Sequence, residues 1–287
     1  MDLPGLQESP VPDGGQAAQA ETFRRLRQRH PQLRIGTSGY SFDDWVGPFY
    51  PAGTSKGKMF DIYLRQFDSV EINSTYYRIP PPRVMRNIDA KTPDGFEFVV
   101  KTHGSFTHER DKFAENLPAF LESISPMTES GKLSGLLAQF PFSFRYSPQN
   151  LDYIVENGSR FAPHSLFVEY RHDSWLRPEV KEAMHDMGIG YCNVDEPALP
   201  HLVPPETAAT TPTGYVRLHG RNAEKWWGGG GERYNYSYTD EQLREWVERL
   251  DALRQKTNKV FVFFNNCHLG RAVKDAQRFM SLLVDEE

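Results

Sequence analysis

The chain has 287 residues, of which 25% are charged, 38% hydrophobic and 13% aromatic, and its formal net charge is −5. This length suits a single α/β barrel, which has about 250 residues, and it allows a large buried core. The negative net charge argues against a protein that wraps DNA through general electrostatics, but it does not exclude a local basic cleft. We expect no membrane partner, because no apolar run in the sequence reaches the length of a membrane span.

The two cysteines indicate a reducing compartment. Cys192 and Cys267 are far apart in the sequence, and no C-x-x-C spacing typical of a zinc site is present. The N-terminus contains acidic residues and prolines and lacks the apolar centre of a secretory signal. We therefore expect a cytoplasmic protein with free thiols.

The first thirty residues differ in composition from the rest of the chain. Residues 1–20 are rich in Gly, Pro, Ala and Gln without an apolar period, which predicts a disordered leader. Residues 21–30 predict a short helix whose arginines form a solvated face. The expected organisation is a flexible leader with a short helical lead-in over 1–30, followed by one barrel domain over 31–287.

Short apolar segments recur along the whole domain and are typical of parallel strands that are buried on both faces. The predicted strands cover residues 34–38, 69–73, 96–101, 135–139, 166–170, 188–193, 215–219 and 259–264.

Segments long enough for helices separate most of these strands. The predicted helices cover residues 58–67, 82–90, 115–125, 149–157, 178–187, 240–254 and 270–283, and Asp240 is the expected cap of the sixth. Alternating strands and helices predict a parallel sheet, and eight units predict a closed barrel. The fold class is therefore α/β, a single-domain TIM-type (β/α)8 barrel. A nucleotide-binding fold is disfavoured because G-x-G-x-x-G and P-loop motifs are absent from the sequence.

Polar residues gather at the C-terminal ends of the predicted strands, often two positions apart. In a barrel these ends line the active-site mouth, and residues two apart share one side of a strand. We therefore expect most of these side chains to converge on one cavity. They are Glu71, Asn73, Lys101, His103, Gln139, Glu169, Arg171, Asn193, Asp195, Arg217, His219 and Asn265 or Asn266.

Acid–base chemistry is the first hypothesis for such a cavity. Glu71 and Glu169 are the candidate acid and base, and Lys101 is a further charge or a nucleophile. The structural alternative is that Glu71 pairs with Lys101 and that Glu169 holds a neighbouring arginine.

The remaining candidates predict the substrate class. Arginine suits carboxylate or phosphate, and aromatic rings suit a sugar or a base, so we expect a small anionic or sugar-like substrate, possibly phosphorylated. The candidate substrate-binding residues are Asn73, Tyr76, His103, Gln139, Arg171, Trp175, Asp195, Arg217, His219, Arg221 and Asn266.

Two other functions compete with this hypothesis. A non-catalytic protein would bind nucleic acid or a phosphorylated metabolite, with Arg221, Trp226 and Trp227 as a clamp. A metal-dependent nuclease or isomerase would use His103, His219, Glu169 and Asp195 as candidate ligands, but H-x-H and H-E-x-x-H motifs are absent. We expect no metal and no cofactor. A serine hydrolase is disfavoured because no G-x-S-x-G motif occurs.

An ordered series of motifs resembles the domain-of-unknown-function 72 (YecE-like) family. The matching segments are Ile35–Trp45, Phe49–Pro51, Val70–Tyr77, Phe98–His103, Leu137–Pro141, Val168–Trp175, Val216–Gly220 and Phe263–Asn266. The resemblance implies a TIM-barrel fold and no established reaction. It also implies shared polar positions at Glu71, Asn73, Lys101, Gln139, Glu169, Arg171, Arg217, His219 and Asn266.

Overall fold

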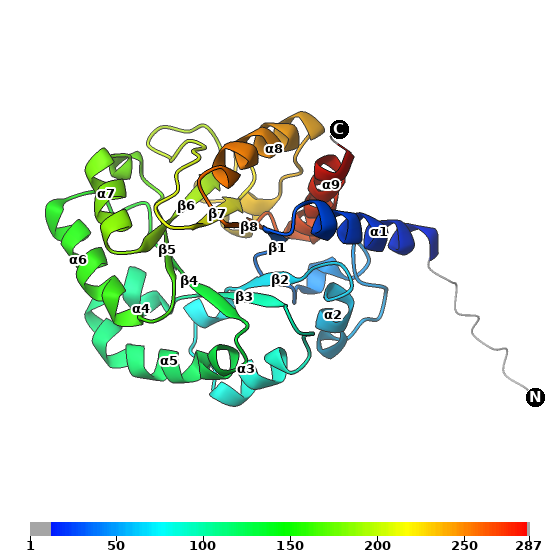
Figure 1. Cartoon of the computed structure of the whole chain (residues 1–287), viewed down its shortest axis with the longest axis horizontal. Helices are drawn as coiled ribbons and strands as arrows, with labels where there is room; N and C mark the ends of the chain where they lie inside the picture. The colour runs from blue at the N-terminus through cyan, green and yellow to red at the C-terminus, as the bar shows by residue number, and fades with distance from the viewer. Residues whose placement is uncertain (1–12, 286–287) are drawn as a thin grey trace, which may run out of the picture.

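The computed structural model describes residues 13–285, and within them eight parallel strands form one barrel (Figure 1). Each strand overlaps its predicted segment, so the predicted (β/α)8 fold is confirmed. The strands are β1 (Leu33–Thr37), β2 (Ser69–Ile72), β3 (Glu97–Lys101), β4 (Leu133–Gln139), β5 (Leu166–Glu169), β6 (Ile189–Asp195), β7 (Thr213–Leu218) and β8 (Lys259–Phe264). Their interiors are buried and apolar, as parallel strands covered by helices require.

The sheet runs in the order β1-β8-β7-β6-β5-β4-β3-β2, so β1 and β2 are its two edges. These edges meet at the C-terminal end of β1, where Ser38 forms an isolated parallel bridge with Glu71. The backbone N–H of Gly39 also donates to the carbonyl of Glu71 at 2.8 Å. The barrel is therefore closed near its mouth by a short backbone contact.

A tyrosine side chain completes the closure below this contact. The Tyr63 hydroxyl accepts a hydrogen bond from the backbone N–H of Thr37 and donates one to the carbonyl of Ser69, both at 3.0 Å. The strands approach closely here, because a Cβ at Gly36 would lie 2.3 Å from the carbonyl oxygen of Ser69. One phenol thus takes the place of a backbone hydrogen bond between β1 and β2.

Helices surround the barrel as predicted (Figure 1). They are α2 (Lys56–Tyr63), α3 (Pro82–Asp89), α4 (Gly104–Thr107), α5 (Phe113–Glu129), α6 (Pro148–Gly158), α7 (Pro178–Asp186), α8 (Asp240–Arg254) and α9 (Arg271–Asp285). The predicted cap of α8 is wrong by one residue: Thr239 accepts from the backbone of Gln242, and the Gln242 side chain bonds back in a capping box. None of the helices in residues 13–285 is long and apolar enough to span a bilayer.

The N-terminal helix is longer than the sequence predicted. Helix α1 (Asp13–Arg29) begins before Glu21, so the predicted disorder is wrong for residues 13–20, and residues 1–12 lie outside the described part. The alanines and glutamines of residues 16–20 favour a helix, which explains the extension. The helix lies beside α9 (Figure 1), buries Leu26 and donates from Arg27 to the carbonyl of Leu33 at 2.8 Å.

The connection between β6 and β7 contains no helix among the described residues 196–212. This loop covers the outer side of β6. Asn193 holds it by donating to the carbonyl of Ala208 at 2.9 Å and accepting from its N–H at 2.8 Å. Thr210 adds a bond to the carbonyl of Ile189 at 2.7 Å. Asn193 therefore faces the loop instead of the barrel interior.

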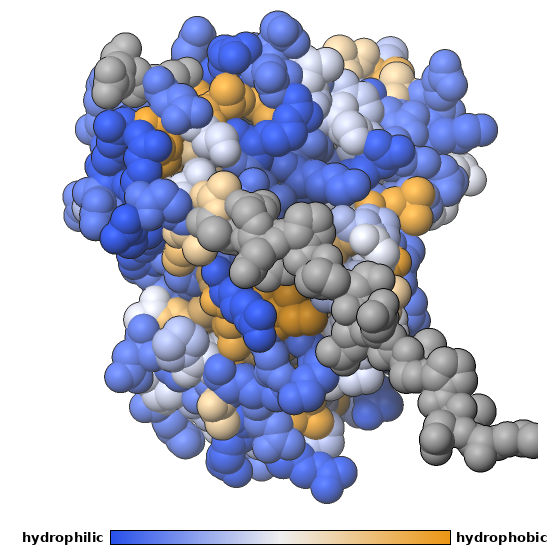
Figure 2. Space-filling view, turned by 90° about the vertical axis from the view of Figure 1, so that its right-hand side faces the viewer, coloured by the Kyte–Doolittle hydropathy of each residue, from blue (hydrophilic) through white to orange (hydrophobic). Residues whose placement is uncertain are grey.

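Charged residues also gather at the opposite, N-terminal ends of the strands. Glu97 accepts from Arg34 at 2.5 Å and from Lys259 at 2.7 Å. Figure 2 shows a largely hydrophilic surface on the side of the molecule next to α1, with hydrophobic side chains gathered in the recess across its middle. The hydrophobic core thus consists of the barrel interior and the contacts between strands and helices, and charged groups lie at both ends of the barrel.

Candidate functional site

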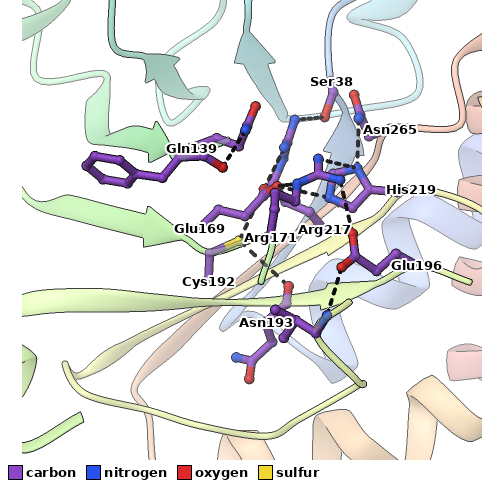
Figure 3. A network of polar contacts seen from close by, with 12 residues as sticks. Ser38, Gln139, Glu169, Arg171, Cys192, Asn193, Glu196, Arg217, His219 and Asn265 are labelled. Carbon is purple, nitrogen blue, oxygen red and sulfur yellow. Dashed lines mark hydrogen bonds and ion pairs between the residues drawn. The ribbon is translucent and has the colours of Figure 1, made fainter. Parts of the chain in front are cut away.

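Arg217 lies at the centre of a buried ionic network near the mouth of the barrel (Figure 3). It is 1% exposed and comes from β7. Its two terminal nitrogens contact Glu169 at 2.6 Å and Glu71 at 2.7 Å, and one of them contacts the Ser38 hydroxyl at 3.3 Å. The second oxygen of Glu71 accepts from the Tyr215 hydroxyl at 2.6 Å. A single guanidinium thus joins β2, β5 and β7 to the residue that follows β1, and it compensates two buried carboxylates.

Arg171 forms the second half of this network. Its Nε contacts Glu169 at 2.5 Å, and its Nη1 contacts Glu196 at 3.0 Å. Burial raises the pKa of Glu196 to about 7. Burial alone would also raise the pKa of Glu169, but the adjacent guanidinium groups of Arg171 and Arg217 hold it well below its ordinary value. Glu169 is therefore a fixed carboxylate between two arginines.

His219 is a neutral hydrogen-bonding residue in this network. Its Nδ1 lies 2.8 Å from the side-chain nitrogen of Asn265 and 3.4 Å from Arg171 Nη2, and both of these atoms are donors. The proton therefore belongs on Nε2, which lies 3.3 Å from Glu169. Burial lowers the pKa of His219 to about 3. His219 therefore faces a carboxylate with its Nε2 and carries no positive charge at neutral pH.

Lys101 differs from the two arginines of the site, because its amine contacts no carboxylate among residues 13–285. Its Nζ donates to Gln139 Oε1 at 2.9 Å and lies 4.4 Å from the ring centroid of Tyr76. The alternative pairing of Lys101 with Glu71 is not formed, because Glu71 is bonded to Arg217 and Tyr215. Burial and then the charge of Arg217 lower the pKa of Lys101 to about 7.

These groups form part of the wall of a cavity of about 430 Å³, which we call the central cavity. Its polar wall includes Asn73, whose buried Oδ1 has no hydrogen-bond partner in the described part of the chain. The other polar lining residues include Ser38, Lys101, Gln139, Arg171, Arg217, Tyr234 and Asn265. Its more apolar wall contains Tyr40, Phe42, Ile72, Tyr77 and Ile88.

A smaller cavity of about 210 Å³, which we call the tryptophan lobe, shares Gln139, Arg171 and Tyr234 with the central cavity. Its other walls include Trp227, which is 53% exposed, and Phe142, whose ring lies edge-on to it at 4.8 Å between centroids. The remaining lining residues are His108, Pro141, Leu202, Trp226 and Arg233. The two cavities therefore meet at three shared side chains.

The structure brings most of the predicted site residues together. Asn73, Lys101, Gln139, Arg171 and Arg217 line the central cavity. Glu71, Glu169 and His219 are fully buried and contact these lining arginines, and Tyr76 lies against Lys101. The two predicted acid–base carboxylates are thus covered by arginines and have no exposed surface.

Asp195 and Arg221 are placed elsewhere, between β6 and α8. Asp195 accepts from Arg221 at 2.7 Å, from Trp246 at 2.6 Å and from Tyr238 at 2.9 Å. Arg221 is held away from Trp226 and Trp227, so the predicted clamp of these three residues is not formed. Asp195 lies outside the site because of the orientation of β6. The strand turns Cys192 toward Glu169, at 3.8 Å, and therefore turns Asn193 and Asp195 outward.

Asn266 also faces outward. Its side-chain nitrogen donates to Asp275 of α9 at 2.7 Å and to the carbonyl of Tyr236 at 2.9 Å. Its neighbour Asn265 lines the central cavity in its place. The sequence analysis chose Asn266 as the substrate-binding residue, and the structure places Asn265 at the site instead.

Trp175 and His103 take structural positions. Trp175 is buried, stacks on Tyr170 at 4.5 Å between centroids and donates to the carbonyl of Phe144 at 2.6 Å. His103 caps the short helix α4 by accepting from the N–H of Ser105 at 3.3 Å. Neither residue lines the two cavities.

Sequence reasoning missed several residues of the site. Ser38 follows β1, and Glu196 follows β6, so the rule that selected the other strand ends would have found both. Tyr234 ends a short 3-10 helix (Gly230–Tyr234) after β7, and His108 directly follows α4, so no strand pattern points to them.

The structure does not bring the four candidate metal ligands together. His219 and Glu169 are in contact, whereas His103 and Asp195 have other partners. Within the described residues, the side chains of His172, Asp173 and His201 offer ligand atoms within 4.8 Å of one another. The Nδ1 of His172 already accepts from the N–H of Ser174 at 3.1 Å, and this cluster lines neither cavity.

Comparisons with known proteins agree with this fold. The family model described as protein of unknown function DUF72 matches residues 34–287. The UPF0759 protein YunF of Bacillus subtilis (strain 168) is 31% identical over 269 residues, which cover 88% of this chain and 94% of that protein. The crystal structure of a DUF72 family protein from Thermotoga maritima has 40% identity and a TM-score of 0.82 over 88% of this chain and 99% of that chain.

A DUF72 family protein from Enterococcus faecalis has 26% identity and a TM-score of 0.79 over 89% of this chain and 96% of that chain. These likenesses extend across the barrel and therefore include every strand that contributes to the two cavities. The chain belongs to the DUF72 family, whose members are described as proteins of unknown function.

Proposed function

We propose that this protein is an enzyme that binds a small anionic substrate in the central cavity and uses Lys101 for proton transfer. The observation that carries the proposal is the environment of Lys101. Lys101 lines the cavity, its amine donates to Gln139 and contacts no carboxylate in the described part of the chain, and its pKa is lowered to about 7. An amine with this pKa exists in both protonation states at neutral pH, which is the condition for acid–base catalysis.

The charges around Lys101 support an anionic substrate. Lys101, Arg171 and Arg217 all line the central cavity, and the two arginines are fixed by Glu71, Glu169 and Glu196. The buried Nε of Arg217 has no hydrogen-bond partner among the described residues. An anion near Lys101 would stabilise its ammonium form, so binding and protonation of Lys101 favour each other.

Glu71 and Glu169 are positioning residues in this proposal. Glu169 has several partners and a strongly lowered pKa, so it is a poor proton acceptor. Glu71 is held by Arg217 and Tyr215. Their role is to fix the guanidinium groups that face the substrate. The neutral amine of Lys101 takes the proton from the substrate and becomes an ammonium, which returns the proton to the product.

Titration of the lysine side chains tests the proposal. Reductive methylation with labelled formaldehyde makes each lysine visible by NMR, and the variant Lys101→Gln identifies the Lys101 signal. We expect the Lys101 signal to titrate near pH 7, well below the ordinary range of a lysine side chain. Added inorganic phosphate should raise the pKa of Lys101. An ordinary pKa that phosphate does not change would contradict the proposal.

Binding of a phosphorylated metabolite without catalysis is the second candidate. The half-exposed Trp227 beside the shared wall of the two cavities favours it, because exposed aromatic rings are typical of ligand-stacking surfaces. The two candidates differ in the effect of pH. Catalysis by Lys101 requires turnover that follows the pKa of this residue, whereas simple binding requires only affinity.

A further inference from the structure

The two cavities divide the site into lobes that meet at one polar wall. Gln139, Arg171 and Tyr234 line both the central cavity and the tryptophan lobe. Arg171 is fixed there by Glu169 and Glu196, and its guanidinium lies 5.9 Å from the ring centroid of Trp226. Because Arg171 lines both lobes, it can bind an anionic group in the middle of a ligand, while one part of that ligand extends into each lobe.

Each lobe also presents an exposed aromatic ring. Tyr77 in the central cavity is 82% exposed, and Trp227 in the tryptophan lobe is 53% exposed. Both rings are supported edge-on by a second ring, Tyr76 in one case and Phe142 in the other. Large aromatic side chains left in water next to a cavity are informative, because the same area is normally buried.

We propose that the ligand is an internal monoanion with a flat ring on each side, of which a phosphodiester with two ring substituents is the chemical type. The anionic group would lie at Arg171, which lines both lobes and supplies the positive charge of their shared wall. One ring would stack at Tyr77 and the other at Trp227. This inference rests on the proposed anion site. A terminal anion carrying one ring would need only one of the two lobes.

A series of diesters tests this directly. Dimethyl phosphate, methyl phenyl phosphate and diphenyl phosphate carry the same single negative charge and differ in their rings. We expect the dissociation constant, measured by NMR titration, to fall by about tenfold for each added ring. Equal affinity of the one-ring and two-ring diesters would overturn the inference.

Three variants show which ring contacts which lobe. Trp227→Ala and Tyr77→Ala should each remove the gain from one ring and leave the affinity for dimethyl phosphate unchanged. Met187→Ala is the matched control, because Met187 is an exposed apolar residue that lines neither cavity. Trp227→Phe should retain most of the gain. If either alanine variant left the two-ring affinity at the level of the control, the inference would be wrong.

The outcomes separate this inference from the proposed function. If dimethyl phosphate and inorganic phosphate both fail to bind, the anion site itself is wrong and the inference falls with it. If dimethyl phosphate binds and shifts the pKa of Lys101 but rings add nothing, the proposed function stands and the two-lobed ligand is excluded.

Discussion

The two ends of the barrel use the same residue types in different surroundings. At the N-terminal ends of the strands, Glu97 pairs with Arg34 and Lys259, and these side chains are between 11% and 35% exposed. At the C-terminal ends, Arg217 pairs with Glu71 and Glu169, and these side chains are at most 2% exposed. Water screens the first cluster and cannot screen the second. An arginine near the mouth is therefore indispensable to its carboxylates, whereas a cation at the other end is replaceable.

Removing the central guanidinium should have the largest effect. In Arg217→Met, Glu71 and Glu169 lose a shared partner and remain buried, which we expect to lower the free energy of unfolding by about 3–5 kcal/mol. Denaturant unfolding measures this loss. The double variant Arg217→Met with Glu71→Gln should recover part of it. A loss below 1 kcal/mol would show that the network near the mouth is no more sensitive than the opposite end.

The lowered pKa of Lys101 predicts a dependence of stability on pH. The unfolded chain binds more protons than the folded one between about pH 7 and the ordinary lysine pKa of 10.5, so stability rises with pH over this range. The rise should amount to a few kcal/mol. Lys101→Met should abolish it, and Lys259→Met at the other end should retain it. The measurement is the free energy of unfolding of both variants between pH 7 and pH 10. If it rose equally steeply with pH in both, the predicted role of Lys101 would be contradicted.

Glu196 should give a smaller effect of opposite sign. Its pKa is about 7 in the folded protein against 4.5 ordinarily, so the folded state binds more protons between these values. Stability contributed by this group is present at low pH and is lost as the pH rises from about 4.5 to 7. Glu196→Gln should flatten this part of the stability profile. An unchanged profile would show that Arg171 keeps Glu196 ionised throughout.

The smallest effect is expected at the N-terminal ends. Lys259→Met removes one of two cations around Glu97, and the partly exposed pair should contribute about 1 kcal/mol or less. Denaturant unfolding at low and high salt measures this contribution. A loss comparable to that of Arg217→Met would remove the distinction between the two ends.

The sequence was sufficient for the fold because the signals of a parallel barrel are local. Each strand is a short apolar run, and each polar residue at its C-terminal end breaks that run visibly. These signals also identified Glu71, Lys101, Gln139, Glu169 and Arg217, which the structure brings together.

The direction of individual side chains could not be predicted in the same way. On β6 the inward position belongs to Cys192, so Asp195 points toward α8, and after β8 the two adjacent asparagines face opposite partners. Which member of such a pair faces inward depends on how each strand is rotated in the closed barrel, and the alternation alone leaves two choices. Tyr234 and Trp227 enter through the loop after β7, whose path depends on tertiary contacts.

The closure by Tyr63 has a consequence for the order of assembly. The first strand pairs along its length with the last, with Leu33 opposite Val260, a separation of 260 − 33 = 227 residues. Contacts of such long range form slowly, and during synthesis β8 is made last. Tyr63 lies only 26 residues from Thr37. Its hydroxyl can hold β1 beside β2 while most of the chain is still to come. The final strand, β8, then inserts between β7 and a β1 that is already in place.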